Sequence, residues 1–393
     1  ASSSSSRGGS TAAKTSPEWE DTIAWLETEL RGLQIARNYP HILDDALVIL
    51  ARWRDEFPKS AWSRVVGSGR VAKELNECAP AIQHAMDVTS AMPSVDADAV
   101  RRGEVVDDRA TIVDLCSGFG YLGMFLSEML DPSKVKAIEL VDKQWPMWTA
   151  ARPTASQINW DHIRGVEGVR ASELGGDRRR DRGGKKKNGP NANADAADAN
   201  ANANDEEDAA ATVDWTPSYP IEITTRKIDI KQASQLRQME RHLFAKRDGP
   251  FVVLGVHLCG TLSLKAIEMF NCHRTAATLV LKPCCLPEWN HTYTHDRWTI
   301  AGSEHVIETR EVCAQGKWRG NRWCGPPRSH LRPKFEKWCD ALCRAVDVSE
   351  DEKRRETIEI QLEGGHQNEF VFATRASYER APGIVSGVYA TKS

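Results

Sequence analysis

Hydrophobic positions in the first hundred residues recur every three or four places, which predicts amphipathic helices. One such stripe joins Ile23, Leu26, Leu30 and Leu33, and a second runs from Ile42 to Phe57. A third helical stretch is expected from about Trp62 to Met86, interrupted by Gly67, Gly69 and Pro80. No catalytic constellation accompanies these helices. We interpret residues 17–105 as a helical N-terminal region that caps a neighbouring domain or positions its substrate.

From about Val106 the pattern changes to short apolar runs separated by helical stretches such as Tyr121 to Leu130 and Ser234 to Ala245. This alternation predicts an α/β fold whose parallel sheet is covered on both faces, with the first five strands in the order 3-2-1-4-5. The last two strands, joined through Gly364-Gly365, predict a closing hairpin. The expected strands are Thr111 to Cys116, Val135 to Val141, Ile221 to Ile230, Val252 to His257, Ala277 to Leu281, Glu356 to Leu362 and Glu369 to Ala373.

The stretch from Gly168 to Ala211 contains only Val169 and Leu174 as large aliphatic residues. Such a composition cannot bury enough surface to fold, so we expect a disordered low-complexity insertion within a domain spanning residues 106–386. Its basic run, Arg178 to Lys187, is typical of an RNA-binding or nuclear-targeting segment, and equally of a solvated loop.

Charge and cysteine content restrict the class of protein. Fifty-two basic and 55 acidic residues give a net charge of −3, which argues against coating nucleic acid or membrane through bulk charge. Ten cysteines in 393 residues are too few for a disulfide scaffold, and no long apolar run is present. We expect reduced thiols, no membrane and an intracellular location, in the cytoplasm or nucleus. The Ser-rich residues 1–16 are expected to be a disordered tail or the remnant of an organellar transit peptide.

A glycine-rich turn follows the first expected strand. Gly118, Gly120 and Gly123 fit G-x-G-x-x-G between a strand and a helix, where backbone can approach a ligand closely. Asp114 lies on the strand just before this turn. A carboxylate repels the pyrophosphate of a dinucleotide and attracts a cation. The pattern therefore favours S-adenosylmethionine, with its sulfonium and ammonium groups, over NAD.

Acidic residues at the next two strand ends extend this ligand site. Asp142 ends the second strand, where a carboxylate can accept the hydroxyl protons of a ribose, and Glu139 is the alternative. Asp229 ends the third strand, where we expect it to face the adenine amino group.

Thiols gather at the carboxyl ends of the first, fourth and fifth strands, which are neighbours in the expected order. These ends carry Cys116, His257 with Cys259, and Lys282 with Cys284 and Cys285. Three interpretations stay open: a zinc site formed by His257 and the three later cysteines, a nucleophilic cysteine activated by His257 or Lys282, and small cysteines that pack where cofactor and backbone meet. We predict no metal. The reference pKa of histidine, near neutrality, makes His257 the expected general base.

These residues resemble a known family. Val113 to Gly120 resembles the first motif of class I S-adenosylmethionine-dependent methyltransferases. His257-Leu258-Cys259-Gly260 and Lys282-Pro283-Cys284-Cys285 are similar to the HxCG and PCC signatures of a eukaryotic branch that includes a tRNA ribose methyltransferase and methyltransferase-like proteins. The resemblance covers about Val106 to Arg375. The chain lacks the zinc-finger spacing of the tRNA enzyme and the Asn/Asp-Pro-Pro-aromatic motif of amino-group methyltransferases.

The resemblance implies a Rossmann-like class I methyltransferase fold with a mostly parallel seven-stranded sheet, here with an N-terminal helical extension. It implies S-adenosylmethionine as cofactor and a substrate near His257 and Cys284. The residues expected to bind the cofactor are Asp114, Cys116, Gly118, Gly120, Tyr121, Asp142 and Asp229. Those expected to be catalytic are His257, Cys284 and Lys282.

A basic segment with interleaved tryptophans follows the fifth strand. Residues 317–334 hold six cations and no acid, a mixture that binds phosphates and stacks bases. The expected substrate-binding residues are Lys317, Trp318, Arg319, Arg322 and Trp323. Alternatively, the tryptophans anchor a loop. We therefore expect a methyltransferase acting on RNA. The alternatives are a catalytically silent scaffold that binds RNA or protein, and a methyltransferase for protein or small molecules.

Overall fold

The computed structural model describes residues 22–67, 69–150, 152–170, 212–245, 249–319, 322–360 and 368–377. The expected N-terminal tail and most of the expected insertion lie outside these residues. Among the described helices, none combines the length and apolar character needed to cross a membrane.

Within the described residues, six helices precede the sheet, and their buried positions follow the predicted stripes. Leu26 and Leu30 are buried in the first helix, and Ile42, Leu50 and Trp53 in the third. The six are α1 (Thr22–Arg31), α2 (Ile35–Asn38), α3 (Pro40–Glu56), α4 (Lys59–Gly67), α5 (Arg70–Ser90) and α6 (Ala97–Arg101).

The interruptions predicted for the third helical stretch are correct in part. The break at the glycines is confirmed, because α4 ends at Gly67 and α5 begins at Arg70. Gly69, with φ of 60°, precedes the first turn of α5 in the left-handed conformation that glycine adopts at little cost. The predicted interruption at Pro80 is wrong, because α5 continues through this residue to Ser90. Pro80 is buried with its neighbours Ala79 and Ala81, so packing of this helix face offsets the hydrogen bond that a proline cannot donate.

Seven strands form the main sheet in the order β12-β13-β7-β6-β1-β2-β5. The order 3-2-1-4-5 expected for the first five strands is confirmed, with all four of their pairings parallel. Strand β13 runs antiparallel to both β7 and β12, which confirms the closing hairpin. The strands are β1 (Ala110–Leu115), β2 (Val135–Asp142), β5 (Glu222–Lys227), β6 (Phe251–Cys259), β7 (Ala276–Cys285), β12 (Lys353–Thr357) and β13 (Glu369–Thr374). Strand β12 begins and ends earlier than expected.

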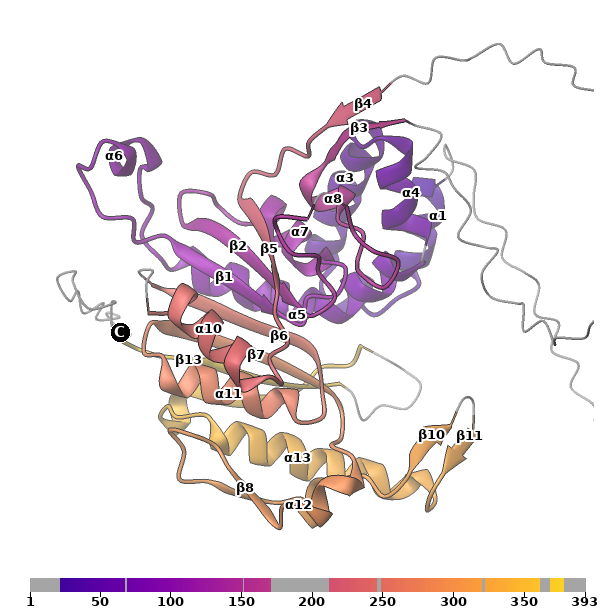
Figure 1. Ribbon diagram of the computed structural model, residues 1–393, viewed down its shortest axis with the longest axis vertical. Helices are drawn as coiled ribbons and strands as arrows, with labels where there is room; N and C mark the ends of the chain where they lie inside the picture. The colour runs from indigo at the N-terminus through magenta and orange to yellow at the C-terminus, as the bar shows by residue number, and fades with distance from the viewer. Residues whose placement is uncertain are drawn as a thin grey trace, which may run out of the picture.

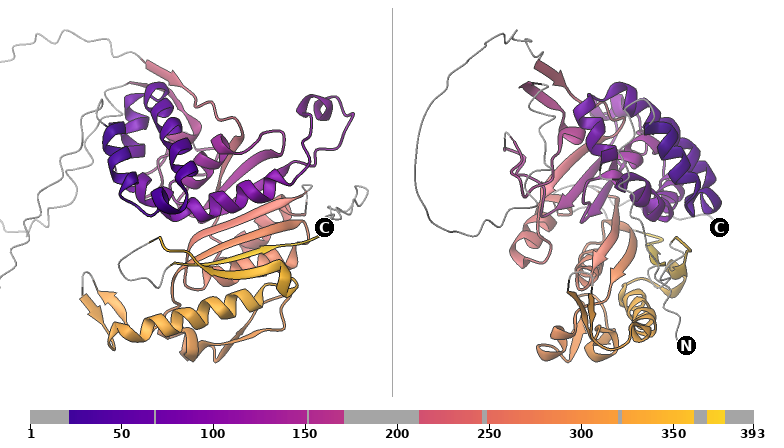
Figure 2. Two further views of the ribbon diagram at one scale, coloured as in Figure 1. Left: turned by 180° about the vertical axis from the view of Figure 1, so that it is seen from behind. Right: turned by 90° about the vertical axis from the view of Figure 1, so that its right-hand side faces the viewer.

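Each face of the sheet belongs to a separate hydrophobic core. Ile112 of β1 packs in a core with the N-terminal helices, whereas its neighbour Val113 points into the opposite core. Figure 1 shows the indigo N-terminal helices above β6 and β7 and the orange helix α13 (Leu331–Ala345) below them, and Figure 2 shows the same layers from two other sides. The first core also holds α7 (Tyr121–Met129), and the second holds α10 (Ala233–Leu243) and α11 (Leu262–Cys272). The N-terminal helices thus share their core with the sheet.

The remaining elements connect these layers. Near the insertion, α8 (Asp161–Arg164) precedes β3 (Val166–Arg170), which pairs with β4 (Thr212–Trp215) in an antiparallel ribbon. Residues 168–170 therefore form a strand where composition predicted the start of the insertion, because backbone pairing with β4 requires no apolar side chains. After β7 come the 3-10 turn Trp289–Tyr293, β8 (Arg297–Thr299), β9 (Val306–Glu308), α12 (Thr309–Val312), β10 (Lys317–Arg319), β11 (Arg322–Cys324) and the 3-10 turn Arg328–His330. A third 3-10 turn, Glu350–Glu352, precedes β12.

Candidate active site at the carboxyl edge of the sheet

Two non-glycine residues adopt left-handed backbone at the ends of adjacent strands. Cys116, which follows β1, has φ of 59°, and His257 of β6 has φ of 69°. The pairing of β6 with β7 shifts register around His257, as a β-bulge does. Strained backbone of this kind costs about 1–3 kcal/mol per residue and concentrates at functional sites. The carboxyl ends of β1 and β6 are therefore the candidate location of the functional site.

The glycine turn leaves open space on one side and packs tightly on the other. A Cβ at Gly118, where φ is 55°, would meet no atom within 4 Å among the described residues, whereas one at Gly120 would lie 2.7 Å from Leu140. Gly120 is thus needed for packing on β2, and Gly118 borders space that a ligand can occupy. Asp142 stabilises the turn by accepting hydrogen bonds from the backbone N–H groups of Gly118 at 3.2 Å and Gln144 at 2.8 Å.

Asp114 presents a buried carboxyl group beside this turn. Its side chain is buried on β1, and its Oδ2 has no hydrogen-bond partner among the described residues. Burial, with the nearby negative charges of Glu74 and Asp142, raises the pKa of Asp114 well above its usual value. A buried carboxyl surrounded by other carboxylates fits a cationic ligand and opposes a pyrophosphate. These carboxyl groups therefore fit the sulfonium and ammonium groups expected of the cofactor.

The other acids divide between ligand-facing and structural positions. Glu139 accepts hydrogen bonds from Arg226 at 2.7 and 2.9 Å and is buried, so it is committed to an ion pair inside the sheet. This leaves Asp142 as the ribose candidate. Asp229 accepts a hydrogen bond from the backbone N–H of Lys231 at 3.0 Å, near the start of α10. Burial raises the pKa of Asp142, and the half-buried Asp229 carboxylate lies close enough to add to this effect.

Two residues assigned to the cofactor lie in different surroundings. The Tyr121 side chain is buried, and its hydroxyl donates to the carbonyl of Val65 at 3.0 Å. This side chain therefore turns towards α4, which the sequence spacing did not reveal, and its role in binding the cofactor stays a prediction. Cys116 does border the site. Burial and the charges of Asp142 and Asp114 raise the pKa of its thiol to about 12, which makes it a poor nucleophile.

A buried glutamate from the N-terminal region joins the expected catalytic residues. Glu77 of α5 lies 2.8 Å from His257 Nε2 and 3.6 Å from Lys282 Nζ. Burial raises the pKa of Glu77, but the close contact with His257 and the charge of Lys282 outweigh this effect and bring the pKa down to about 2. Lys282 is only 1% exposed, so its ammonium neutralises Glu77 and does not reach substrate.

The sequence analysis missed Glu77 because α5 precedes the glycine turn and carries no motif. One signal was available. Glu77 shares a helix face with Pro80, Ala81 and His84, all buried, and a charged residue among buried neighbours requires a partner. Glu74 lies one turn earlier, with its carboxylate 4.0 Å from His257.

The thiols at the ends of β6 and β7 form one cluster. Cys259 Sγ lies 3.0 Å from Cys284 Sγ, and Cys284 Sγ lies 3.7 Å from Cys285 Sγ. Hydrogen bonds from the other two thiols lower the pKa of Cys259, and the hydrogen bond to Cys259 raises the pKa of Cys284. These opposite shifts favour the thiolate on Cys259 over that on Cys284, the thiol expected from the sequence to be catalytic.

The basic segment forms the hairpin β10–β11, with Lys317 opposite Cys324. Trp323 donates its indole N–H to the carbonyl of Pro326 at 2.7 Å, so this tryptophan anchors its own hairpin. The backbone of Lys317, Trp318, Arg319 and Arg322 belongs to these strands, but the placement of their side chains lies outside the described part of the structure.

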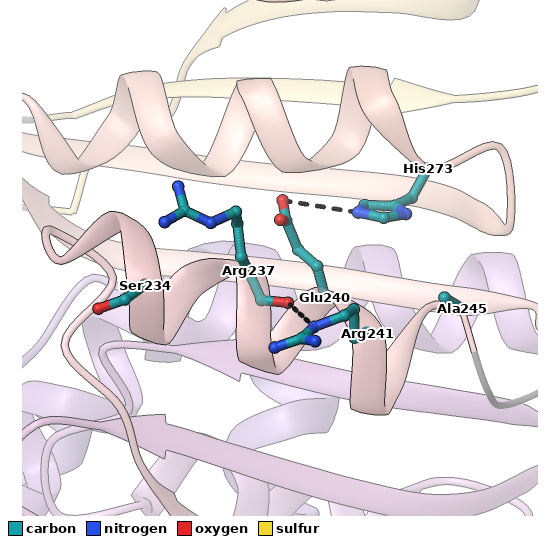
Figure 3. A pocket seen from close by; sticks show the side chains of 6 residues that line it. All are labelled: Ser234, Arg237, Glu240, Arg241, Ala245 and His273. Carbon is teal, nitrogen blue, oxygen red and sulfur yellow. Dashed lines mark hydrogen bonds and ion pairs between the residues drawn. The ribbon is translucent and has the colours of Figure 1, made fainter.

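A separate pocket lies on the outer surface of α10 and next to the end of α11. Figure 3 shows that Glu240 points to His273, at 3.5 Å, and that Arg241 donates to the carbonyl of Arg237. Ser234 and Ala245 complete the lining. None of the site residues expected from the sequence lines this pocket, and it takes no part in the arrangement described above.

Comparison with known proteins agrees with this geometry. A family model described as a methyltransferase domain matches residues 83–291, more than half of the chain. The match includes the glycine turn, Asp142, His257 and the three clustered cysteines, and begins after Glu77. No curated protein sequence matches the chain.

Proposed function

The chain belongs to the methyltransferase domain family, and from this premise we propose that it takes its methyl group from S-adenosylmethionine and transfers it to RNA. The buried Asp114 carries the first half of the proposal. Its unpartnered Oδ2 needs a hydrogen-bond donor, and a donor that is also a cation satisfies both the geometry and the excess of negative charge.

Three parts of the site would hold this cofactor. Asp114 would pair with the ammonium group, the open side of Gly118 would accommodate the ligand next to the backbone, and Asp142 would accept the ribose hydroxyl protons. When bound, the sulfonium supplies an electrophilic methyl group. The contribution of the protein is then mainly positioning and exclusion of water, as expected for in-line transfer between bound groups.

His257 is the proposed general base, with Glu77 as its positioning residue. The Glu77 carboxylate lies 2.8 Å from Nε2, so Nδ1 is the ring nitrogen proposed to exchange a proton with the acceptor. An ionised Glu77 also stabilises the imidazolium that forms when His257 takes a proton. Lys282 keeps this buried carboxylate charged at neutral pH.

RNA is the proposed acceptor because cationic and aromatic residues border the same edge of the sheet. Strand β12 is parallel to β7, since both are antiparallel to β13. Helix α13 leads into β12 and therefore begins near the carboxyl edge, where Figure 1 shows the β10–β11 hairpin. On the loop after β2, Trp148 is 48% exposed and the guanidinium of Arg164 lies 4.3 Å from its ring centroid. Exposed tryptophan beside arginine is suited to stacking unpaired bases.

Calorimetric titration with S-adenosylmethionine, S-adenosylhomocysteine and NAD tests the cofactor, and labelled methyl transfer to total RNA and to protein extract tests the acceptor. We expect both adenosyl ligands to bind, NAD not to bind, and label to enter RNA. Asp142→Ala should weaken adenosyl binding, while Glu139→Gln should lower stability and leave affinity unchanged. If neither adenosyl ligand binds, the alternative of a catalytically silent scaffold replaces the proposed enzyme. If label enters protein and not RNA, protein replaces RNA as the proposed acceptor.

A further inference from the structure

We propose that Cys259, Cys284 and Cys285 bind one soft divalent metal ion, Zn²⁺, through three thiolates, with the fourth coordination position open at the carboxyl edge of the sheet. This replaces the sequence-based expectation of no metal. The proposed transfer of a methyl group does not require this ion, so the two proposals stand or fall separately.

The geometry of the cluster carries the proposal. The three sulfur atoms lie within 4.8 Å of one another, with separations of 3.0 Å and 3.7 Å for two of the pairs. Tetrahedral zinc with sulfur at about 2.3 Å holds neighbouring sulfurs about 3.8 Å apart. A small rotation of the Cys259 side chain therefore brings the set to the spacing of a metal centre.

The backbone fixes these thiols in place. Cys259 and Cys285 are paired residues at the ends of the parallel strands β6 and β7, and the N–H of Gly260 donates to the carbonyl of Cys285 at 3.2 Å. Ligands on neighbouring strands are held more precisely than ligands on a loop. The sequence analysis weighed these cysteines with His257 as a zinc site, but the set has no standard zinc spacing, since one ligand is separated from the other two by all of α11.

The exposure of the cluster argues for an open position. Cys259 and Cys285 are exposed, and Cys284 is half-buried. Structural zinc sites are closed by four protein ligands, whereas sites with three protein ligands leave one position to water or substrate. Here the metal would take a water molecule, exchangeable for a nitrogen or sulfur donor, close to the place where Cys116 borders the cofactor site.

Metal analysis of the full-length chain tests the proposal. The protein is produced in zinc-supplemented medium, purified with a phosphine reductant, and analysed by mass spectrometry for metal content. We expect about one zinc per chain. The separate variants Cys259→Ser, Cys284→Ser and Cys285→Ser should each lose zinc affinity by more than the roughly 10- to 100-fold that removal of an outer-shell partner costs. Cys272→Ser, an exposed cysteine away from the cluster, is the matched control and should retain the metal.

Two further measurements keep the result interpretable. Cobalt substitution should give a thiolate-to-cobalt absorption band that the three variants lose, and Cys285→His, which keeps a ligand, should recover part of the metal content. Melting curves and adenosyl titration show whether each variant is folded, independently of the metal. Zinc-free wild-type protein after supplementation would overturn the proposal, as would full zinc content in all three variants. An intact mass lower by two hydrogens without reductant, with no bound zinc, would indicate a Cys259–Cys284 disulfide instead.

Discussion

The Glu77 carboxylate lies 2.8 Å from His257 Nε2, linking a helix of the N-terminal region to a bulge in the central sheet. The contact brings α5 to the candidate active site, and the residue proposed to orient the base lies outside the segment matched by the family model. The proposed function therefore assigns the N-terminal region a specific side chain as well as a packing role.

Replacing Glu77 by Gln should lower kcat on the order of tenfold to a hundredfold with little change in the KM for S-adenosylmethionine. A positioning residue contributes less than the roughly 10²–10⁴ of the base itself. Steady-state kinetics at pH 7 measures kcat and KM separately. Glu56→Gln, on the exposed side of α3, is the control; an unchanged kcat in Glu77→Gln would assign Glu77 a structural role only.

The same substitution should destabilise the fold, because it leaves the buried Lys282 ammonium without its carboxylate. Breaking a buried pair on one side costs about 3–5 kcal/mol. The double variant Glu77→Gln/Lys282→Met removes both charges and should recover a large part of this loss. Urea unfolding at pH 7 measures the three free energies. If the single and double variants unfold alike, the two groups are not coupled.

Acid should weaken the fold through Glu77. Its pKa of about 2 in the folded chain lies below the usual value of 4.5, so the stabilisation is complete above pH 4.5 and is lost as the pH falls towards 2. The difference corresponds to about 3 kcal/mol. Urea unfolding of wild type and Glu77→Gln at pH 7, 4.5 and 3 should therefore show a steeper loss for wild type. Parallel curves would contradict the assignment.

Binding of the cationic cofactor should strengthen as pH rises. The pKa of Asp114 is raised in the ligand-free protein, so a cation that needs the carboxylate must displace a proton. Calorimetry in buffers of different ionisation enthalpy should detect this proton release. Asp114→Asn should weaken affinity by about 1.5–3 kcal/mol and abolish the release, whereas Asp131→Asn at the opposite edge should change neither. Equal affinity for wild type and Asp114→Asn would remove Asp114 from the site.

The two glycines of the turn should respond differently to alanine. Both have positive φ, which costs alanine about 1–2 kcal/mol. Gly120→Ala also meets Leu140 at 2.7 Å, so overpacking should add about 1–3 kcal/mol. Gly118→Ala should cost only the strain but should lose cofactor affinity, since its methyl group enters the open space. Thermal melting measures the loss of stability in each variant, and ligand titration measures the loss of cofactor affinity. Normal affinity of Gly118→Ala would place the ligand elsewhere.

The fold was predictable from the sequence wherever local pattern determines it. Apolar runs ending in Asp142 and in His257 identified the strands and the edge where ligands bind, because a buried parallel strand must leave its polar residues at its end. The contacts between distant elements were not predictable. Nothing in the spacing told which way Tyr121 turns at the start of α7, or that Glu139 would be occupied by Arg226 of another strand.

The ribbon β3–β4 holds together two parts of the chain that are distant in sequence. Arg170 pairs with Thr212, so the described segments 152–170 and 212–245 meet at this ribbon. The ribbon is a sheet of its own, separate from the seven-stranded sheet, so its backbone pairing leaves the register of the main sheet unaffected. A reporter domain inserted between Arg170 and Thr212 should therefore leave the candidate site at the carboxyl edge intact.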